Sequence, residues 1–161
     1  GVHHIDTDLI QDTRLLPDPC DLVCLCEVIE HLTGDLVPVF ARLSRWVAPD
    51  GYLYVTTPNL RSISGLAGLV RHGSGLASKC HETVRQQYER AEGEGGYFGH
   101  VREYTAKEVV DFICSFGFGH VASAYQFHPR AETLDRKLIQ AMERMLPPWR
   151  LFGKHLFRKT G

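Results

Sequence analysis

The chain has 161 residues, of which 43% are hydrophobic and 23% charged, and its 18 Lys and Arg against 19 Asp and Glu give a net charge of −1. These values predict one soluble globular domain with a hydrophobic core, and they exclude a disordered or collagen-like chain. Because no stretch approaches the roughly 20 apolar residues of a membrane span, we expect no membrane partner. Proteins that bind duplex nucleic acid are usually far more basic, so nucleic acid is disfavoured as a partner.

The cysteines bear on the cellular compartment. None of the five forms a C-x-x-C pair, which leaves a structural zinc site without support. Cys24 and Cys26 alternate within an apolar run, and we expect both to be buried, reduced thiols. Reduced thiols, together with the lack of a visible signal peptide, predict a cytoplasmic protein.

Strand and helix signals alternate from the start of the chain. The apolar-leaning run 2–5 ends in acidic residues and predicts a short strand. The continuous apolar run 22–26 predicts a strand that is buried on both faces. Asp35 is a suitable N-cap for a helix over 36–47, whose apolar side chains fall on one face.

The middle of the chain changes character after one more strand. A Pro-Asp-Gly turn at 49–51 precedes a β-rich segment at 52–57, which Pro58 and Asn59 end. Residues 60–99 are dense in glycine and include a charged stretch. We interpret 60–99 as an insertion or lid over the top of the fold.

Regular structure is predicted again from Thr105. The Thr105 and Glu108 pair has capping-box spacing at a helix start, and Gly117 fits the stop signal after that helix. A strand, an amphipathic helix and a last strand are predicted to follow over 119–127, 134–145 and 151–157. Alternating strands and helices predict a βαβ sheet that binds ligands at the carboxyl ends of its strands, here the loops after Cys26 and Thr57.

Three motifs occur in a fixed order along the chain. Residues 20–32 read CDLVCLCEVIEHL, residues 48–59 read APDGYLYVTTPN, and residues 100–105 read HVREYT before a helix that ends in Gly-Phe. In this order and spacing they resemble the fourth-strand and later motifs of class I S-adenosylmethionine-dependent methyltransferases. The resemblance covers about residues 2–126. It implies a Rossmann-like α/β sheet with strand order 3-2-1-4-5-7-6, S-adenosylmethionine as cofactor, and methyl transfer.

The same resemblance implies an incomplete domain. Too few residues separate Asp8 from Asp21 to hold a helix, a strand and another helix, so 2–5 resembles the third strand of the family. The glycine-rich cofactor loop and the acid that holds the ribose would precede Gly1, in a segment of roughly 60 residues at about 30 per βαβ unit. We therefore expect residues 1–161 to form strands three to seven, to leave strand four as an exposed apolar edge, and to need the missing N-terminal segment as partner.

Residues that match the cofactor positions of the family follow the predicted strands. The resemblance implies that Asp8 and the adjacent Leu9 lie at the adenine end of the cofactor. It also implies that Cys26 and Glu27 form the wall of the cofactor cleft.

A group of acids and histidines follows the strand at 22–26. Glu27, Glu30 and His31 form an E-x-x-E-H pattern, and His100 arrives from the lid end. We expect His31 and His100 as candidate general bases with Glu30 beside them. The alternative is that all four hold a divalent metal, because the pattern also resembles small-RNA 3′-terminal 2′-O-methyltransferases.

The acceptor pocket is expected to include Arg102, Tyr104 and Asn59. The remaining histidines, among them His120 and His155, have no partner spacing and are expected on the surface.

Three functions remain open from the sequence. The first is methyl transfer from S-adenosylmethionine to a small-molecule or saccharide-like acceptor, with this chain a fragment of the enzyme. The second is metal-assisted 2′-O-methylation of RNA ribose. The third is a non-catalytic, methyltransferase-like binding domain.

Overall fold

A computed structural model describes residues 8–11, 18–73, 75–76, 85–86, 100–126 and 134–160, with only the backbone given at 134–136. The strand expected at 2–5 and most of the segment expected as a lid lie outside these residues. The elements are β1 (Cys20–Cys26), η1 (Ile29–His31), α1 (Leu36–Trp46), β2 (Val47–Pro58), α2 (Ile63–His72), α4 (Ala106–Cys114), β3 (Phe118–Gln126), α5 (Leu134–Met145), η2 (Pro147–Trp149) and β4 (Phe152–Lys159).

The four strands form one mixed sheet in the order β1-β2-β4-β3. β1 and β2 are parallel, whereas β4 runs antiparallel to both β2 and β3. This order reproduces the 4-5-7-6 half of the expected strand sequence. Because β1 and β2 are parallel, their carboxyl ends lie at the same end of the sheet, which brings the segments after Cys26 and Pro58 together.

Helices α1 and α4 begin where the sequence predicts, whereas α2 lies in the segment interpreted as a lid. The Asp35 carboxylate caps α1 by accepting a hydrogen bond from the Val37 amide at 2.9 Å. Thr105 and Glu108 form the reciprocal capping box of α4. Gly117 follows α4 with φ 81°, a left-handed conformation that residues with a Cβ adopt at a cost.

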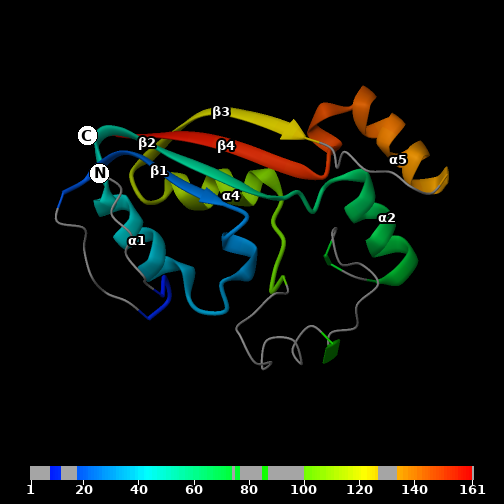
Figure 1. The fold of residues 1–161 in the computed structure, drawn as a ribbon, viewed down its shortest axis with the longest axis horizontal. Coiled ribbons are helices and arrows are strands. Elements are labelled where there is room, and N and C mark those ends of the chain that lie inside the picture. The colour runs from blue at the N-terminus through cyan, green and yellow to red at the C-terminus, as the bar shows by residue number, and fades with distance from the viewer. Residues whose placement is uncertain are drawn as a thin grey trace, which may run out of the picture.

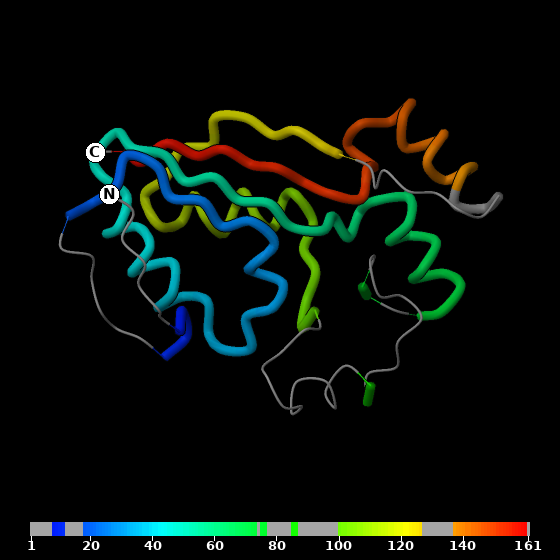
Figure 2. Tube along the Cα trace, in the orientation of Figure 1, coloured from blue at the N-terminus to red at the C-terminus, as the bar shows by residue number. Residues whose placement is uncertain are grey.

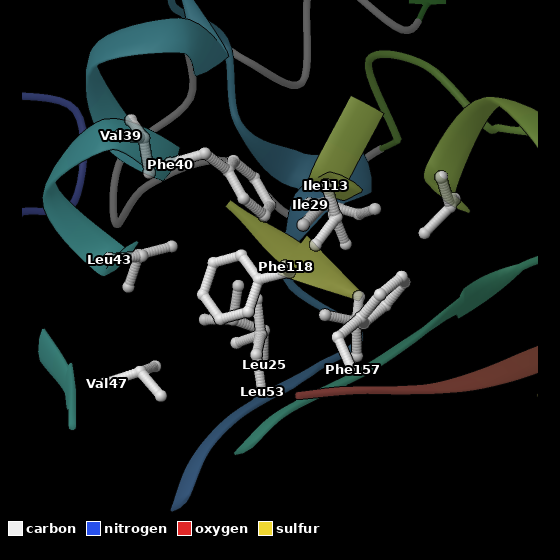
Figure 3. Close-up of a cluster of buried hydrophobic side chains, with 12 residues drawn as sticks. Leu25, Ile29, Val39, Phe40, Leu43, Val47, Leu53, Ile113, Phe118 and Phe157 are labelled. Atoms are coloured by element: carbon white, nitrogen blue, oxygen red, sulfur yellow. The ribbon is translucent and has the colours of Figure 1, made fainter. Parts of the chain in front are cut away.

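The hydrophobic core lies between the sheet and the two helices α1 and α4, which cover the same face in Figure 1. Phe40 and Leu43 from α1 point toward Leu53 of β2, Ile113 of α4 and Phe157 of β4, and these side chains are almost completely buried (Figure 3). Full burial of one such side chain contributes about 1.5–3 kcal/mol. The core thus fixes the sheet to α1 and α4 and holds the loops at its carboxyl end.

The expected burial of both faces of β1 is wrong. Leu25 is buried on the face that α1 covers, but Leu22, Cys24 and Cys26 on the opposite face are exposed. The expected burial of the two thiols is wrong for the same reason, since no described element packs on that face. Both thiols are free rather than disulfide-bonded.

Two further expectations need correction. The Pro-Asp-Gly segment 49–51 lies inside β2, where the pairing jumps from Cys20 with Val47 to Leu22 with Tyr52. The segment 49–51 therefore forms an irregularity within the strand, where β2 has more residues than β1 between two paired positions. His155 is not a surface residue, because its place in β4 on the core face leaves it only 1% exposed.

Candidate functional site

The segment after β1 turns sharply at Glu27. Its φ of 54° is in the left-handed region, which costs a residue with a side chain about 1–2 kcal/mol. The Glu27 amide donates to the carbonyl of Thr56 at 3.0 Å and to its hydroxyl at 3.1 Å, at the end of the neighbouring strand. These bonds hold the turn and direct the chain into η1, which carries Glu30 and His31.

Glu30 is a fully buried carboxyl group, with a relative exposure of 0%. Its Oε2 accepts a hydrogen bond from the Thr57 hydroxyl at 3.0 Å, while Oε1 has no hydrogen-bond partner among the described residues. Burial, assisted by the nearby charge of Glu27, raises the pKa of Glu30 from an ordinary 4.5 to about 7. Hydrogen bonds to the carboxylate and the nearby His100 act in the opposite direction. Glu30 can therefore exchange a proton near neutral pH.

Two imidazoles face this carboxyl group. His31 Nε2 lies 4.0 Å from Glu30 Oε1, and the rings of His31 and His100 meet edge to face with centroids 4.7 Å apart. The segment that carries His100 is anchored beside η1 by the Val101 amide, which donates to the Glu30 carbonyl at 2.7 Å. Figure 2 shows this segment, which leads up to α4, running alongside η1. The structure thus brings His100 beside Glu30 and His31, from which it is distant in sequence.

Sequence reasoning missed two residues that support this cluster. Glu103 is 2% exposed, and its Oε1 lies 2.7 Å from His100 Nδ1. Thr57, which donates to Glu30, is 1% exposed. The three-residue spacing between His100 and Glu103 was a signal that could have found the first. No sequence signal pairs Thr57 with Glu30, because only the parallel pairing of β1 with β2 brings them together.

The residues expected at the adenine end of the cofactor lie on a short turn. The Asp8 carboxylate accepts hydrogen bonds from the amides of Ile10 at 2.7 Å and Gln11 at 3.2 Å. The Leu9 carbonyl accepts from the Arg42 guanidinium on α1, and the Leu9 side chain packs against the core. The placement of Asp8 and Leu9 is thus set by turn and helix contacts, and their cofactor role stays a prediction.

The three residues expected to contact the acceptor differ in their freedom to do so. Arg102 is exposed, pairs with Glu108 at 2.7 Å and stacks over the half-buried ring of Tyr104 at 5.0 Å. Burial raises the pKa of Tyr104 above its ordinary value of 10. Asn59 is buried, and its amide donates to the carbonyls of Pro148 and Arg150 at 3.1 and 3.0 Å. Both amide hydrogens of Asn59 are therefore engaged within the chain.

Solved structures with the same architecture decide the fold. The chain matches a S-adenosylmethionine-dependent methyltransferase from Mesorhizobium loti with a TM-score of 0.56 and 14% identity, over 95% of this chain and 67% of that one. It matches a SAM-dependent methyltransferase from Archaeoglobus fulgidus with a TM-score of 0.56 and 15% identity, over 96% and 66% of the two chains. The chain has the class I methyltransferase fold. The N-methyltransferase NodS from Bradyrhizobium japonicum, in complex with S-adenosyl-L-homocysteine, also matches, with a TM-score of 0.50 and 14% identity over 96% and 53% of the chains.

The match to this methyltransferase fold is one of structure rather than of sequence. No protein-family model matches the sequence, and no curated protein matches it significantly. The chain spans about two thirds or less of the length of the methyltransferase structures named above. None of the helices formed by the described residues combines the length and apolar character needed to cross a bilayer.

On the class I methyltransferase fold, the cluster lies where ligand chemistry is expected. Glu27 and Glu30 follow the carboxyl end of β1, and Thr57 lies near the carboxyl end of β2, at the end of the sheet where α/β folds bind their ligands. The cluster combines a carboxyl group that titrates near pH 7 with two imidazoles. Such a group can accept a proton from a bound nucleophile.

The cluster also has a donor set that suits a divalent metal. One ligand atom each from Glu30, His31 and His100 can be chosen so that all lie within 4.8 Å of one another. Glu30 Oε1, which accepts no hydrogen bond from the residues that the structure describes, is the natural carboxylate ligand. Glu103, bound to the Nδ1 of His100, corresponds to the outer carboxylate that often orients a metal-binding imidazole. Glu27, the fourth expected ligand, is exposed and does not join this group of three.

Proposed function

We propose that the protein is a S-adenosylmethionine-dependent methyltransferase that acts on a small-molecule or saccharide-like acceptor. A nucleophilic oxygen or nitrogen of the acceptor attacks the methyl carbon of the sulfonium, the carbon–sulfur bond breaks, and S-adenosylhomocysteine leaves. The proton of the acceptor passes to a base in the cluster of Glu30, His31 and His100. The observation that carries the proposal is this cluster, with its buried carboxyl group and two partly exposed imidazoles, at the ligand-binding end of a class I methyltransferase fold.

His100 has the best geometry for the base. The Glu103 carboxylate only accepts hydrogen bonds, so at 2.7 Å it favours the tautomer in which His100 Nδ1 carries the proton. The lone pair is then on Nε2, which can accept the acceptor proton. The positive charge that develops on the ring is stabilised by Glu103, which is itself buried and therefore held in place.

We infer the roles of the other site residues from their positions along the chain and in the fold. Cys26 and Glu27 would form the wall of the cofactor cleft beyond β1, with Asp8 and Leu9 toward the adenine. Arg102 is exposed beside the cluster, and its guanidinium could hold a polar group of the acceptor. Asn59 would act by fixing the chain after β2 against η2, since its amide is already engaged there.

A metal-assisted reaction, such as 2′-O-methylation of RNA ribose, is the second candidate function. Glu30 Oε1 favours it, because this oxygen lies beside two imidazoles and accepts no hydrogen bond within the described part of the chain. Glu30, His31 and His100 would hold the ion, which would bind acceptor hydroxyl groups and lower their pKa. Mixed imidazole and carboxylate ligands suit Mn²⁺ or Zn²⁺ better than Mg²⁺.

The test is methyl transfer from radiolabelled S-adenosylmethionine by the protein expressed from its complete coding sequence, against a panel of hydroxyl and amine acceptors. His31→Ala and His100→Ala are expected to lower kcat by about 10²–10⁴-fold, with little effect on cofactor affinity. His72→Ala is the matched control, because His72 is an exposed histidine on α2, outside the cluster. Unchanged rates in the cluster variants would remove these histidines from the mechanism.

A chelator separates the two candidate functions. Activity that survives EDTA supports metal-free transfer, whereas loss on EDTA and recovery with Mn²⁺ supports the metal-assisted reaction. Absence of any transfer together with absence of cofactor binding would leave the protein as a binding domain.

A further inference from the structure

The helix α2 exposes its apolar side and buries its smallest residues. Leu66, Leu69 and Val70 are exposed, with Val70 at 89%. The buried residues of the helix are Gly65 and Gly68. A surface helix normally packs its apolar stripe against the core, so α2 shows the reverse arrangement.

The helix α5 shows the same reversal. Leu138, Met142 and Met145 follow one another at helical spacing on one side, and all three are exposed, with Met145 at 81%. The buried residue is Glu143, whose carboxylate accepts a hydrogen bond from the Ser64 hydroxyl of α2 at 3.2 Å. α2 and α5 therefore meet through polar groups, beyond the end of the sheet where β2 ends (Figure 1), and direct apolar side chains outward.

The charged side chains that the structure describes as exposed on these two helices are cationic. Arg71 on α2 and Lys137 and Arg144 on α5 are exposed. Lys137 and Arg144 are seven residues apart, so they flank the apolar stripe of α5 along one edge. The only described acidic side chain on the two helices is the buried Glu143. This local excess of cations occurs in a chain with a net charge of −1.

We propose that α2 and α5 form a docking surface for an anionic membrane, with both helices lying in the interface. Leu and Met side chains enter the headgroup region, while Arg71, Lys137 and Arg144 contact anionic headgroups. The expectation of no membrane partner rested on the lack of a spanning segment, which an interfacial helix does not need. A second copy of the chain fits this face less well, because a two-fold contact would bring two cationic faces together.

The test is flotation of the complete protein with vesicles of phosphatidylcholine alone or with 30% phosphatidylglycerol. Binding is expected to the anionic vesicles and to be on the order of tenfold weaker with neutral ones. It is also expected to weaken in 1 M salt, which screens the headgroup charges. Absence of binding to anionic vesicles, or equal binding to both, would overturn the proposal.

Two variants locate the surface. The double variant Val70→Gln and Met142→Gln is expected to weaken vesicle binding by on the order of tenfold, since it removes apolar insertion without adding charge. Val37→Gln is the matched control, because Val37 is an exposed valine on α1. Wild-type binding by the double variant would refute this location. If that variant fails to fold, the lipid and salt series on the wild type still decides.

Light scattering on the same samples tests the other occupants. A dimer that the double variant abolishes, without vesicle binding by the wild type, would show that a second copy covers this face and would overturn the proposal. Binding of vesicles by a monomer supports it.

Discussion

Replacement of Glu30 by Gln tests the electrostatics of the site directly. In the folded chain, burial raises the pKa of Glu30 from 4.5 to about 7. At 1.36 kcal/mol per pKa unit, this difference corresponds to about 3 kcal/mol. Between these two pH values the folded state binds more protons than the unfolded state, so the free energy of unfolding falls as pH rises. The contribution is present in full below pH 4.5 and is lost above pH 7.

Glu30→Gln removes this titration and keeps an oxygen that accepts the hydrogen bond from the Thr57 hydroxyl. We expect wild type and variant to have similar unfolding free energies at pH 4.5, and the variant to be more stable by about 3 kcal/mol at pH 8. Urea denaturation at a series of pH values, with EDTA present, measures the difference. The comparison between the two proteins cancels the titration of groups that do not interact with Glu30.

Glu108→Gln is the control, because its effect on stability is expected to depend on pH in the opposite direction. Glu108 lies at the start of α4, where the backbone hydrogen bond from Thr105 lowers its pKa. Its contribution to stability is present above pH 4.5 and is lost as pH falls, so its Gln variant is less stable at high pH. A difference between wild type and Glu30→Gln that does not depend on pH would refute the reasoning about Glu30.

Three further predictions address other buried polar groups. Glu103→Gln is expected to lower kcat by at least about tenfold, to shift the pH profile of kcat and to leave cofactor affinity unchanged. Glu103→Asp is expected to restore part of the rate. An unshifted pH profile would show that Glu103 has only a packing role. Burial, and then the charge of His120, lower the pKa of His155 from 6.5 to about 4. The free energy of unfolding therefore falls as pH drops from 6.5 to 4. His155→Gln should reduce this loss of stability in urea denaturation at a series of pH values. Asn59→Ala should cost about 1–3 kcal/mol of stability, since it removes the donor to the carbonyls of Pro148 and Arg150. Calorimetry should show unchanged cofactor affinity. A selective rise in the KM for the acceptor would instead show that Asn59 binds the acceptor.

Local signals in the sequence were sufficient for most helix and strand positions. Asp35, the Thr105 and Glu108 pair, and Gly117 define helix ends through contacts within a few residues, so their roles follow from spacing alone. The resemblance to class I methyltransferases supplied the strand order, which no local pattern carries. The observed order β1-β2-β4-β3 and the structural matches confirm that fold.

Burial was harder to predict, because it depends on what packs against a face. The run 22–26 is apolar on both sides, yet only the Leu25 side meets α1, so Cys24 is exposed. His155 is flanked by Lys154 and Leu156, a pattern that does not predict burial, and it is buried because β4 lies in the middle of the sheet. Helix α1 decides the outcome for β1, whereas the neighbouring strands decide it for His155.

At the candidate site, too, the sequence predicts which residues come together but not all of their contacts. Glu30 and His31 adjoin in sequence, and His100 was expected to approach them. The contacts of Glu103 with His100 and of Thr57 with Glu30 depend on side-chain directions that only the folded chain defines. These two contacts hold the cluster in place, and local sequence patterns do not predict them.

The central claim is that this fold binds S-adenosylmethionine and presents it to the cluster of Glu30, His31 and His100. Isothermal titration of S-adenosylmethionine into the protein expressed from its complete coding sequence measures this most directly. The account predicts saturable 1:1 binding that His100→Ala leaves nearly unchanged while methyl transfer is lost. Absence of binding by a folded wild-type protein would contradict it.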